Sequence, residues 1–364
     1  MANSDIYRSL CTHRYPQAVR QEIQDLRAFP GFYPLATSRF ISNVGNGISP
    51  IALAYGVLSL EGSSGRDLSI VMAARFFPLI AFMLFGGVLA DRFQRNRLVG
   101  GSDMVGSFLA ATSAISLIVG FSSVWLLALM GALFGILNAI WWPAMSGVLP
   151  EIVPKEELQK GNAIIGLLTN IGYIVGTLLG GVIVSVVGSG WGLLADALTF
   201  FIAGVIVWNL PILGKVKEKS PGILHDLRIG WREFISRSWV IALVFAFALI
   251  NMNFESLLSV LGPLNFNDPI SGPKYWSYNL AGLSCGMLIG GIWILKAKLQ
   301  RPLFLAVALI ALSGIWDLAL AFDLPLYSSV IAAFLAGITT EIFIVTWTTS
   351  LQHHVPEESY SRVA

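Results

Sequence analysis

The sequence predicts an all-α membrane protein, and three observations lead to this fold class. Hydrophobic residues make up 55% of the 364 residues and charged residues only 12%, against about 25% in an ordinary soluble domain. The mean hydropathy is +0.72. Apolar stretches of about 20 residues recur along the chain, and each is long enough to cross a bilayer core as a helix. The apolar residues exceed what a soluble core requires, so the excess must face lipid.

Ten stretches are predicted to span the membrane, with a long polar connection between the sixth and the seventh. They cover residues 33–60, 68–90, 98–120, 123–148, 158–187, 190–210, 238–261, 275–295, 302–322 and 325–350. This connection divides the chain into four regions: an N-terminal tail (1–32), a six-helix half (33–210), a central loop (211–237) and a second half with four helices (238–364). Charged and apolar residues alternate at helical spacing in the loop, which fits either a helix on the membrane surface or a solvated linker.

Lysine and arginine residues lie almost entirely on one side of the predicted membrane. Of the 23, 19 fall in the tails and the even-numbered connections, whereas the connections on the opposite side hold only Arg66 and Lys274. Because cytoplasmic loops are rich in these residues, the sequence predicts a cytoplasmic N-terminus in the cytoplasmic (inner) membrane. No apolar leader followed by small residues precedes the first span, so we expect insertion to begin with that span.

Two sequence marks recur at nearly the same offset. The segment "GGVLADRFQRNRL" (86–98) closes the second span, and "GGIWILKAKLQRPL" (290–303) closes the eighth, 204 residues later. The segments "EIVPKEEL" (151–158) and "HHVPEESY" (353–360) follow the fourth and tenth spans at an offset of 202. Two marks in register indicate duplication, and two parallel six-helix halves form a recurring transporter architecture. We therefore expect a chain truncated after ten of twelve spans.

The segment 86–98 concentrates charge between two apolar spans. Within seven residues it holds one aspartate and three arginines, namely Asp91, Arg92, Arg95 and Arg97. An aspartate that faces arginines can form charge-assisted hydrogen bonds that latch one conformation, and the small Gly86 and Gly87 let two helices approach closely. Asp103, about five residues into the third span, is expected to join this latch. The arginines alone are also explained as topology anchors.

The same segment resembles the signature loop between the second and third helices of the major facilitator superfamily. The residues at its glycine, aspartate and basic positions are Gly87, Asp91, Arg92, Arg95 and Arg97, whereas Gln94 stands where the family usually has glycine. The stretch "GYIVGTLLGG" (172–181) is similar to the glycine-rich motif of the superfamily's antiporters, with Thr177 in place of the usual proline. Its motif glycines are Gly172, Gly176, Gly180 and Gly181. Ordinary helix packing also explains these glycines.

Three further stretches resemble the drug:proton antiporter branch that holds macrolide-efflux and enterobactin-exporter proteins. They are "RFISNVGNGISPIAL" (39–53), "DALTFFIAG" (196–204) and "LPEIVPKEELQKGNA" (149–163). The resemblance implies a major facilitator fold of two six-helix halves. It also implies export of a bulky amphipathic small molecule (a drug, macrolide or siderophore-like compound) by alternating access, coupled to proton influx. Uptake, lipid flipping, and a transport-inactive membrane sensor or scaffold stay open as alternatives.

Polar residues inside the spans are candidate transport residues, because ionisable groups are costly in lipid. Those on the first, fourth, seventh and tenth spans, the helices that line the cavity of the superfamily fold, are Arg39, Asn43, Asn46, Asn138, Asn251, Glu255 and Glu341. Asn138 and Glu341 are 203 residues apart and hence equivalent under the repeat. Glu255 and Glu341 are expected to handle protons or another coupling cation.

Other functional classes are not indicated. The spans hold no nucleophile–base or carboxylate–histidine pattern, so we expect no enzyme activity, and no G-x-x-x-x-G-K-[ST] phosphate loop occurs. All four histidines lie in tails or connections, so neither a metal nor another cofactor is expected. A net charge of +2 does not suggest a nucleic-acid partner. We expect a monomer whose partners are the lipid bilayer, a small-molecule substrate and the coupling cation.

Overall fold

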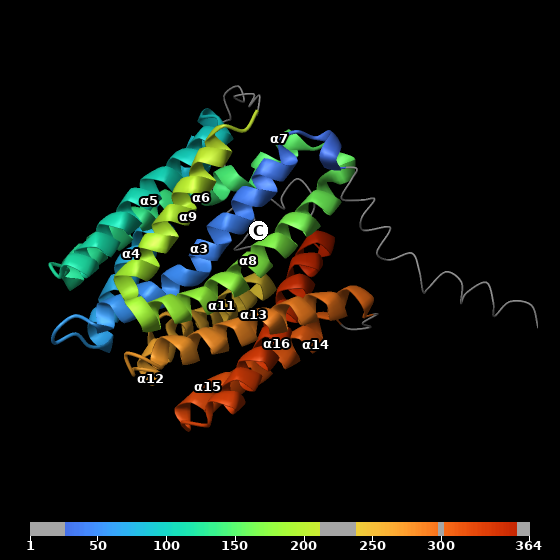
Figure 1. Cartoon of the computed structure of the whole chain (residues 1–364). Helices are drawn as coiled ribbons and strands as arrows, with labels where there is room; N and C mark the ends of the chain where they lie inside the picture. Colours follow the sequence, from blue (N-terminus) through green and yellow to red (C-terminus); the bar gives the residue numbers. More distant parts are fainter. Residues whose placement is uncertain (1–25, 212–237, 298–301, 355–364) are drawn as a thin grey trace, which may run out of the picture.

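The computed structural model describes residues 26–211, 238–297 and 302–354, and these residues form helices without strands (Figure 1). Helices cover, at least in part, all ten ranges that the sequence predicts to span the membrane. Most of the tail 1–32, nearly all of the central loop 211–237 with its predicted surface helix, and parts of the second repeat copies lie outside the described residues.

Six long helices form the N-terminal half. They are α3 (Phe32–Leu58), α4 (Gly65–Arg92), α5 (Arg95–Val119), α6 (Val124–Ser146), α8 (Leu158–Val187) and α9 (Ser189–Trp208). The short elements that precede α3 or connect α6 to α8 are η1 (Leu26–Ala28), α7 (Val148–Ile152) and η2 (Lys155–Glu157). Glycine ends α5 and α8, because Gly120 and Gly188 have φ angles of 84° and 99°, which other residues rarely adopt.

The described C-terminal half contains four further spans, two of which change their helical winding. The first consists of α11 (Ser238–Ser256), the π-helical turn η3 (Leu257–Leu261) and α12 (Gly262–Asn265). The others are α13 (Gly272–Lys296), the series α14 (Pro302–Ile310), η4 (Ala311–Ser313) and α15 (Gly314–Ala321), and α16 (Leu326–His354). Pro263 follows η3 closely and has no backbone N–H to donate, so the regular α-helical pattern is interrupted there.

The two halves repeat one packing arrangement, in which glycine brings their second and fourth helices together. In the first half α4 packs on α6, and a methyl group at Gly86 would collide with the carbonyl oxygen of Ala139. In the second half α13 packs on α16, and a methyl group at Gly290 would lie 2.6 Å from the carbonyl oxygen of Ile338. The repeated sequence marks therefore build equivalent contacts.

Large apolar side chains are exposed along the helices. Phe77 is 75% exposed and Trp125 74% exposed, and many others share this character. Seven helices in the described part of the chain are long and apolar enough to cross a membrane. Helices suit this environment because they satisfy their backbone polar groups internally. The chain is a multi-pass membrane protein.

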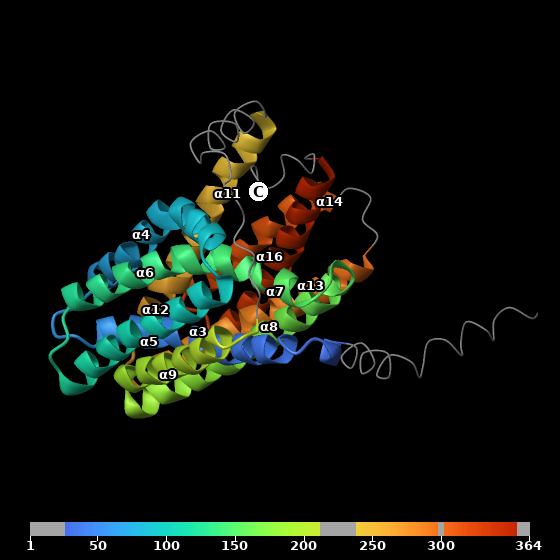
Figure 2. The same ribbon diagram turned by 90° about the horizontal axis from the view of Figure 1, so that it is seen from above.

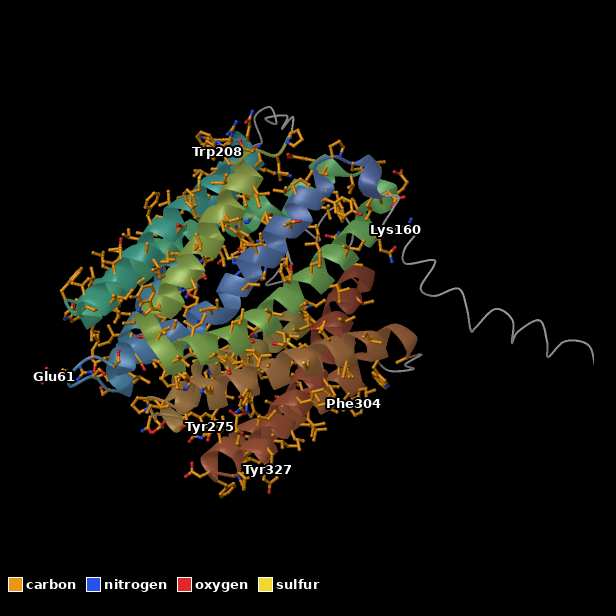
Figure 3. The ribbon with its side chains drawn as sticks, in the orientation of Figure 1. Glu61, Lys160, Trp208, Tyr275, Phe304 and Tyr327 are labelled. Atoms are coloured by element: carbon orange, nitrogen blue, oxygen red, sulfur yellow. The ribbon has the colours of Figure 1, made fainter. Side chains whose placement is uncertain are left out.

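The bundle has two ends, which labelled side chains identify in Figure 3. Glu61, Tyr275 and Tyr327 lie at one end, called the Glu61 end below. Trp208 and Lys160 lie at the opposite end, called the Trp208 end. Because successive spans run in opposite directions, the connection that carries the latch motif, between α4 and α5, lies at the Trp208 end.

The halves meet along α8 and α13, which lie side by side in Figures 1 and 2. The largest apolar cluster crosses between the halves, since it contains Ile51 and Val71 of the first half together with Trp276 and Trp316 of the second. The two tryptophan rings stack with their centroids 5.6 Å apart. These residues lie in the turns of their helices nearest the Glu61 end, so the apolar core joins the halves there.

Candidate functional site

The three arginines of the latch motif lie in different environments. Arg95 Nη1 lies 3.4 Å from Glu151 Oε1 of α7, and the Arg97 guanidinium lies 4.5 Å from the centre of the Trp208 ring. Arg92 is exposed. The side chain of Asp91 is outside the described part of the structure, so its role as the acidic member of the latch stays a prediction.

Small residues at this end make room for the latch. The structure confirms the close approach at Gly86, whereas the expectation is wrong for Gly87, where a methyl group would meet nothing within 4 Å. The Arg95 guanidinium lies over Gly147, where any Cβ would collide with it. Burial raises the pKa of the Glu151 carboxyl, although Arg95 opposes this shift. The Arg95–Glu151 pair therefore does not fully offset the loss of water around the carboxylate.

Asp103 interacts with a residue with which the sequence did not pair it, and its part in the latch stays a prediction. It is only 4% exposed, and its charge interacts with that of Arg39 on α3. The Arg39 guanidinium lies 4.6 Å from the centre of the Trp141 ring of α6. The prediction placed Asp103 by its distance along the chain, but the neighbouring helix that an aspartate faces is decided by helix packing. Arg39 and Asp103 thus join α3, α5 and α6.

The polar residues Asn43 and Asn46 of α3 form hydrogen bonds within the bundle. Asn43 is 6% exposed and donates a hydrogen bond to the Arg39 carbonyl oxygen at 2.7 Å. Asn46, which is half-buried, donates to Asn43 Oδ1 at 3.5 Å. Asn43 and Asn46 lie close together on α3, and the buried part of this surface packs on α8, where Asn43 lies beside Gly172.

The glycine-rich motif in α8 packs as its spacing predicts. A methyl group at Gly172 would lie 2.6 Å from the Phe40 carbonyl oxygen, and one at Gly180 would lie 2.9 Å from the Ile48 Cα. Between them, Gly176 lies against the carbonyl of Val44. Gly181 faces another direction: it contacts α13 of the second half, where a Cβ would collide with the Ser277 side chain and come within 3.0 Å of the Pro273 carbonyl oxygen.

Four predicted cavity residues lie on the three remaining spans. Glu341 of α16 is half-buried over Gly291 of α13, and Asn138 of α6 is also half-buried. Glu255 and Asn251 of α11 are exposed. Glu255 is the residue that faces across the halves, because its charge interacts with Arg75 of α4 and with Tyr173 of α8.

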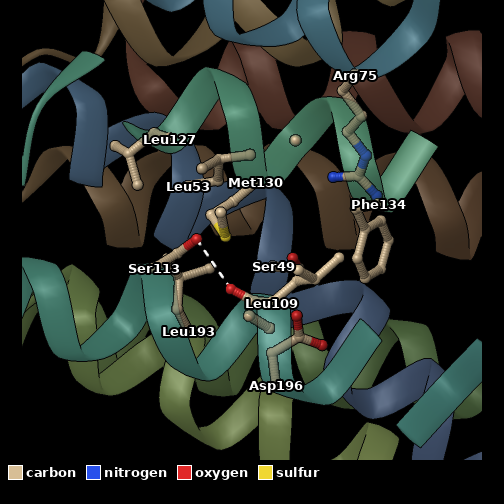
Figure 4. Close-up of a pocket in the computed structure, with 12 residues that line it drawn as sticks. Ser49, Leu53, Arg75, Leu109, Ser113, Leu127, Met130, Phe134, Leu193 and Asp196 are labelled. Carbon is tan, nitrogen blue, oxygen red and sulfur yellow. Dashed lines mark hydrogen bonds between the residues drawn. The ribbon is translucent and has the colours of Figure 1, made fainter. Parts of the chain in front are cut away.

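A small cavity inside the N-terminal half holds two charged residues to which the sequence assigns no role. Arg75 and Asp196 lie on its wall, and its volume is about 40 Å³ (Figure 4). None of the seven predicted cavity residues lines it. Their charge inside predicted spans was the signal that could have found Arg75 and Asp196. The sequence could not show that two helices distant along the chain bring them together.

One hydrogen bond connects the halves at the Glu61 end. Tyr55 of α3 donates from its hydroxyl group to the Phe266 carbonyl oxygen at 2.7 Å, and the Phe266 ring packs near Trp276. The next turn is ordered by Asp268, whose Oδ1 accepts hydrogen bonds from Ser271 N at 2.6 Å and Ser271 Oγ at 2.7 Å. The backbone and side-chain bonds from Ser271 hold the pKa of Asp268 below its usual value. These contacts close the Glu61 end of the junction.

Tyr55→Phe is expected to loosen this closure. The substitution removes the hydroxyl donor and leaves the Phe266 carbonyl without it, at a net cost of about 0.5–1.5 kcal/mol, which shifts the closed-to-open equilibrium roughly two- to twelvefold. Spin labels at the exposed Glu61 and Asn267, in a background lacking Cys11 and Cys285, report the separation of the halves. A distance distribution identical to that of the Tyr55 protein would contradict the assignment.

Comparison with known proteins places these features in a family. The sequence profile described as the Major Facilitator Superfamily matches residues 35–364. Macrolide efflux protein A of Streptococcus pyogenes is 28% identical over 291 residues, which make up 77% of this chain and 70% of that protein. The multidrug efflux pump Tap of Mycobacterium tuberculosis is 26% identical over 282 residues, or 74% of this chain and 66% of that protein.

Solved structures agree in fold. A bacterial homolog of the human lysosomal transporter Spinster, in an inward-facing and unoccupied conformation, matches with a TM-score of 0.67 at 15% identity, covering 91% of this chain and 77% of the other. The nucleoside transporter NupG matches with a TM-score of 0.70 at 12% identity, covering 91% and 84%. With helices over all ten predicted ranges and a family profile that matches residues 35–364, the chain belongs to the Major Facilitator Superfamily of transporters.

Proposed function

We propose that this transporter exports a bulky, amphipathic small molecule by alternating access, coupled to proton influx. The observation that carries the proposal is the junction at the Glu61 end, where a hydrogen bond from Tyr55 and the contact of Gly181 with α13 hold two packed halves together. Such a junction can open as the halves rock as rigid bodies. The similarity to a macrolide efflux protein and a multidrug efflux pump supports the substrate class and the outward direction.

The proposal includes an orientation and a latch. With the N-terminus in the cytoplasm, the Trp208 end faces the cytoplasm of a cell whose inner membrane holds the protein as a monomer. The residues at that end that we assign to the latch are Gly87, Asp91, Arg92, Arg95 and Arg97. The Arg95–Glu151 contact supports this assignment, because it ties the start of α5 to α7.

The proposed transport residues lie nearer the middle of the bundle. Asn46, Asn138 and Asn251 supply amide groups that can bind a polar part of the substrate. Glu341 and Glu255 are the carboxylates proposed to take up the coupling proton. Both lie inside predicted spans, where an ionisable group is costly and is therefore a candidate for a functional role.

Everted membrane vesicles test the export reaction with radiolabelled erythromycin as the probe. Vesicles that contain the chain are expected to accumulate the macrolide when an acid-inside pH gradient is imposed, and to release it when a protonophore collapses the gradient. Vesicles without the chain supply the control. Accumulation in the opposite direction would favour uptake. No gradient-dependent movement of erythromycin or of a second amphipathic cation such as ethidium would favour a transport-inactive sensor or scaffold.

Glu341→Gln tests the coupling group within the same assay. Loss of the carboxylate is expected to reduce gradient-driven accumulation at least about tenfold, which corresponds to roughly 1.4 kcal/mol of coupling free energy. The exposed Asp323 provides a control of similar chemistry in Asp323→Asn. Its φ of 48° is one that asparagine tolerates. Full coupled transport by Glu341→Gln would remove Glu341 from the proton pathway.

A further inference from the structure

An almost completely buried carboxylate lies inside the N-terminal half, apart from both the latch and the predicted cavity residues. Asp196 of α9 is 1% exposed, and its Oδ1 has no hydrogen-bond partner among the described residues. This oxygen lies over Gly45 of α3, where a methyl group would be 2.5 Å from it. The absence of a side chain at Gly45 therefore lets α3 approach the carboxylate closely.

Asp196 borders the cavity shown in Figure 4. The wall is mostly apolar, with Leu53, Leu127 and Leu193 among its residues. A cavity of about 40 Å³ has room for water, which needs polar partners to stay there. Polar groups are present, since Ser49, Ser113, Arg75 and Asp196 also line the cavity. The Ser113 hydroxyl already donates to the Leu109 carbonyl oxygen at 3.1 Å, the bond drawn dashed in Figure 4.

Arg75 enters the same cavity from α4, on the side opposite Asp196 in Figure 4. Its guanidinium lies 4.9 Å from the centre of the Phe134 ring, which keeps the cation close to an aromatic face. Two carboxylates attract it: Asp196 within the same half and Glu255 on α11 of the other half. Arg75 is therefore within electrostatic reach of a carboxylate in each half of the transporter.

Among the described residues on the helices around Asp196, Arg75 is the charged residue that interacts with its carboxylate. Of the helices packed near α9, α3 carries Arg39 and α5 carries Asp103, but these two interact with each other. Asp103 lies beside Gly204, two helical turns from Asp196 along α9. The nearest titratable group of α8 in this network is Tyr173, which interacts with Glu255 and not with Asp196. From α6 the cavity receives Met130, Gly131 and Phe134, which carry no charge.

Glu255 and Arg75 belong to different halves, and the proposed transport cycle moves these halves relative to each other. Glu255 lies in the second half, and the π-helical turn Leu257–Leu261 begins two residues later. Such turns are frequent at functional positions within helices. A change in the separation of the halves therefore changes the distance from Glu255 to Arg75, whereas Asp196 and Arg75 stay within one half.

We propose that Asp196 is a proton-binding site, and that Arg75 controls it by passing between Asp196 and Glu255 as the halves rock. This inference rests on the proposed proton-coupled export, and it gives Glu255 the role of a carboxylate that competes for Arg75 in place of the role of a proton carrier. While Glu255 holds Arg75, the Asp196 carboxylate binds a proton taken from water in the cavity. When Glu255 withdraws, Arg75 pairs with Asp196, and the proton passes to cavity water and then to the bulk. Arg75 stays protonated throughout, so one proton enters the site and one leaves it in each cycle.

Infrared difference spectroscopy of the full chain in lipid nanodiscs tests the proton site without any substrate. A protonated carboxyl absorbs at a higher frequency than a carboxylate, so spectra recorded across a pH series follow its titration. The wild-type spectra are expected to contain such a band, and isotope-labelled aspartate is expected to shift it. The band is expected to be lost in Asp196→Asn and kept in Asp323→Asn. A titrating band that neither the label nor Asp196→Asn affects would overturn the assignment.

Substitutions of Arg75 and Glu255 test whether Arg75 controls the protonation of Asp196. In Arg75→Gln the Asp196 band is expected to persist to a pH higher by at least about one unit, because a nearby opposite charge has been removed. In Glu255→Gln the midpoint is expected to move to lower pH, because Arg75 is then left to Asp196 alone. An unchanged midpoint in both variants would overturn the role of Arg75. If Asp196→Asn does not fold, Asp196→Glu replaces it, because its carboxyl band is expected to be no longer shifted by isotope-labelled aspartate.

Transport in everted vesicles separates failure of this site from failure of the proposed function. With erythromycin as the probe, Asp196→Asn is expected to lose gradient-driven accumulation at least about tenfold and to keep exchange of labelled for unlabelled macrolide. Wild-type vesicles without accumulation, together with a titrating Asp196 band, would reject the proposed export and leave the proton site. Gradient-driven accumulation by Asp196→Asn at the wild-type level would reject the coupling role of Asp196 and leave the export.

Discussion

Gly176→Leu is expected to destabilise the folded protein by at least about 3 kcal/mol, the upper end of the usual cost of overpacking. Even the first carbon of a side chain at Gly176 would collide with the carbonyl oxygen of Val44 and lie 2.8 Å from its carbonyl carbon. Backbone atoms of α3 cannot rotate away as a side chain can. The whole contact between α3 and α8 must therefore open, and the contacts at Gly172 and Gly180 open with it.

The same helix provides a matched control for this substitution. Gly166 also lies in α8, but a Cβ there would meet nothing within 4 Å. Gly166→Leu introduces the same side chain into open space and is expected to leave stability unchanged or slightly raised, because leucine favours a helix more than glycine does. Thermal unfolding in detergent, followed by size-exclusion chromatography, compares the two variants. Equal melting temperatures would show that α3 and α8 do not depend on close contact at Gly176.

Arg39→Met is expected to destabilise the protein by about 3–5 kcal/mol, because it leaves the Asp103 carboxylate buried without its cation. Asp103 is 4% exposed and Arg39 9% exposed, so water replaces neither partner readily. The substitution also removes the cation from the face of the Trp141 ring. Methionine keeps a long, flexible side chain, so most of the loss comes from charge and not from volume.

The double variant Arg39→Met/Asp103→Asn isolates the electrostatic part of this effect. Removing both charges is expected to restore more than half of the stability lost in Arg39→Met, since no uncompensated charge remains buried. The same detergent unfolding measurement compares the single and double variants. If the double variant is as unstable as Arg39→Met, packing of the arginine stem, and not its charge, is what stabilises the junction of α3, α5 and α6.

Local patterns predicted the elements of this fold and part of its packing. The ten apolar stretches predicted the spans, because burial in lipid requires a continuous run of about 20 apolar residues. The spacing of four between Gly172, Gly176 and Gly180 predicted one flat helix face, and this face contacts α3. The spacing could not show that Gly181, on the adjacent face, contacts the second half.

The sequence predicted the functional site less completely than the helices, and two aspartates show the physical reason. Asp103 was assigned to the latch by its nearness in sequence to the arginines, yet it faces Arg39, which lies 64 positions earlier in the chain. Asp196 and Arg75 were recognisable only as charged residues inside spans. Partners on different helices depend on how each helix is rotated about its axis, and this rotation is set by packing against several neighbours at once.

The sequence by itself determined the membrane environment, the positions of the described helices along the chain, and the family resemblance. These properties depend on composition and on periodicity within single helices, which the order of residues contains directly. Only the tertiary structure decided which charges interact: Arg95 pairs with Glu151, Arg39 interacts with Asp103, and Arg75 interacts with both Asp196 and Glu255. In a low-dielectric interior such interactions are strong but still weaken with distance, so their identity depends on which groups the packed helices bring near one another.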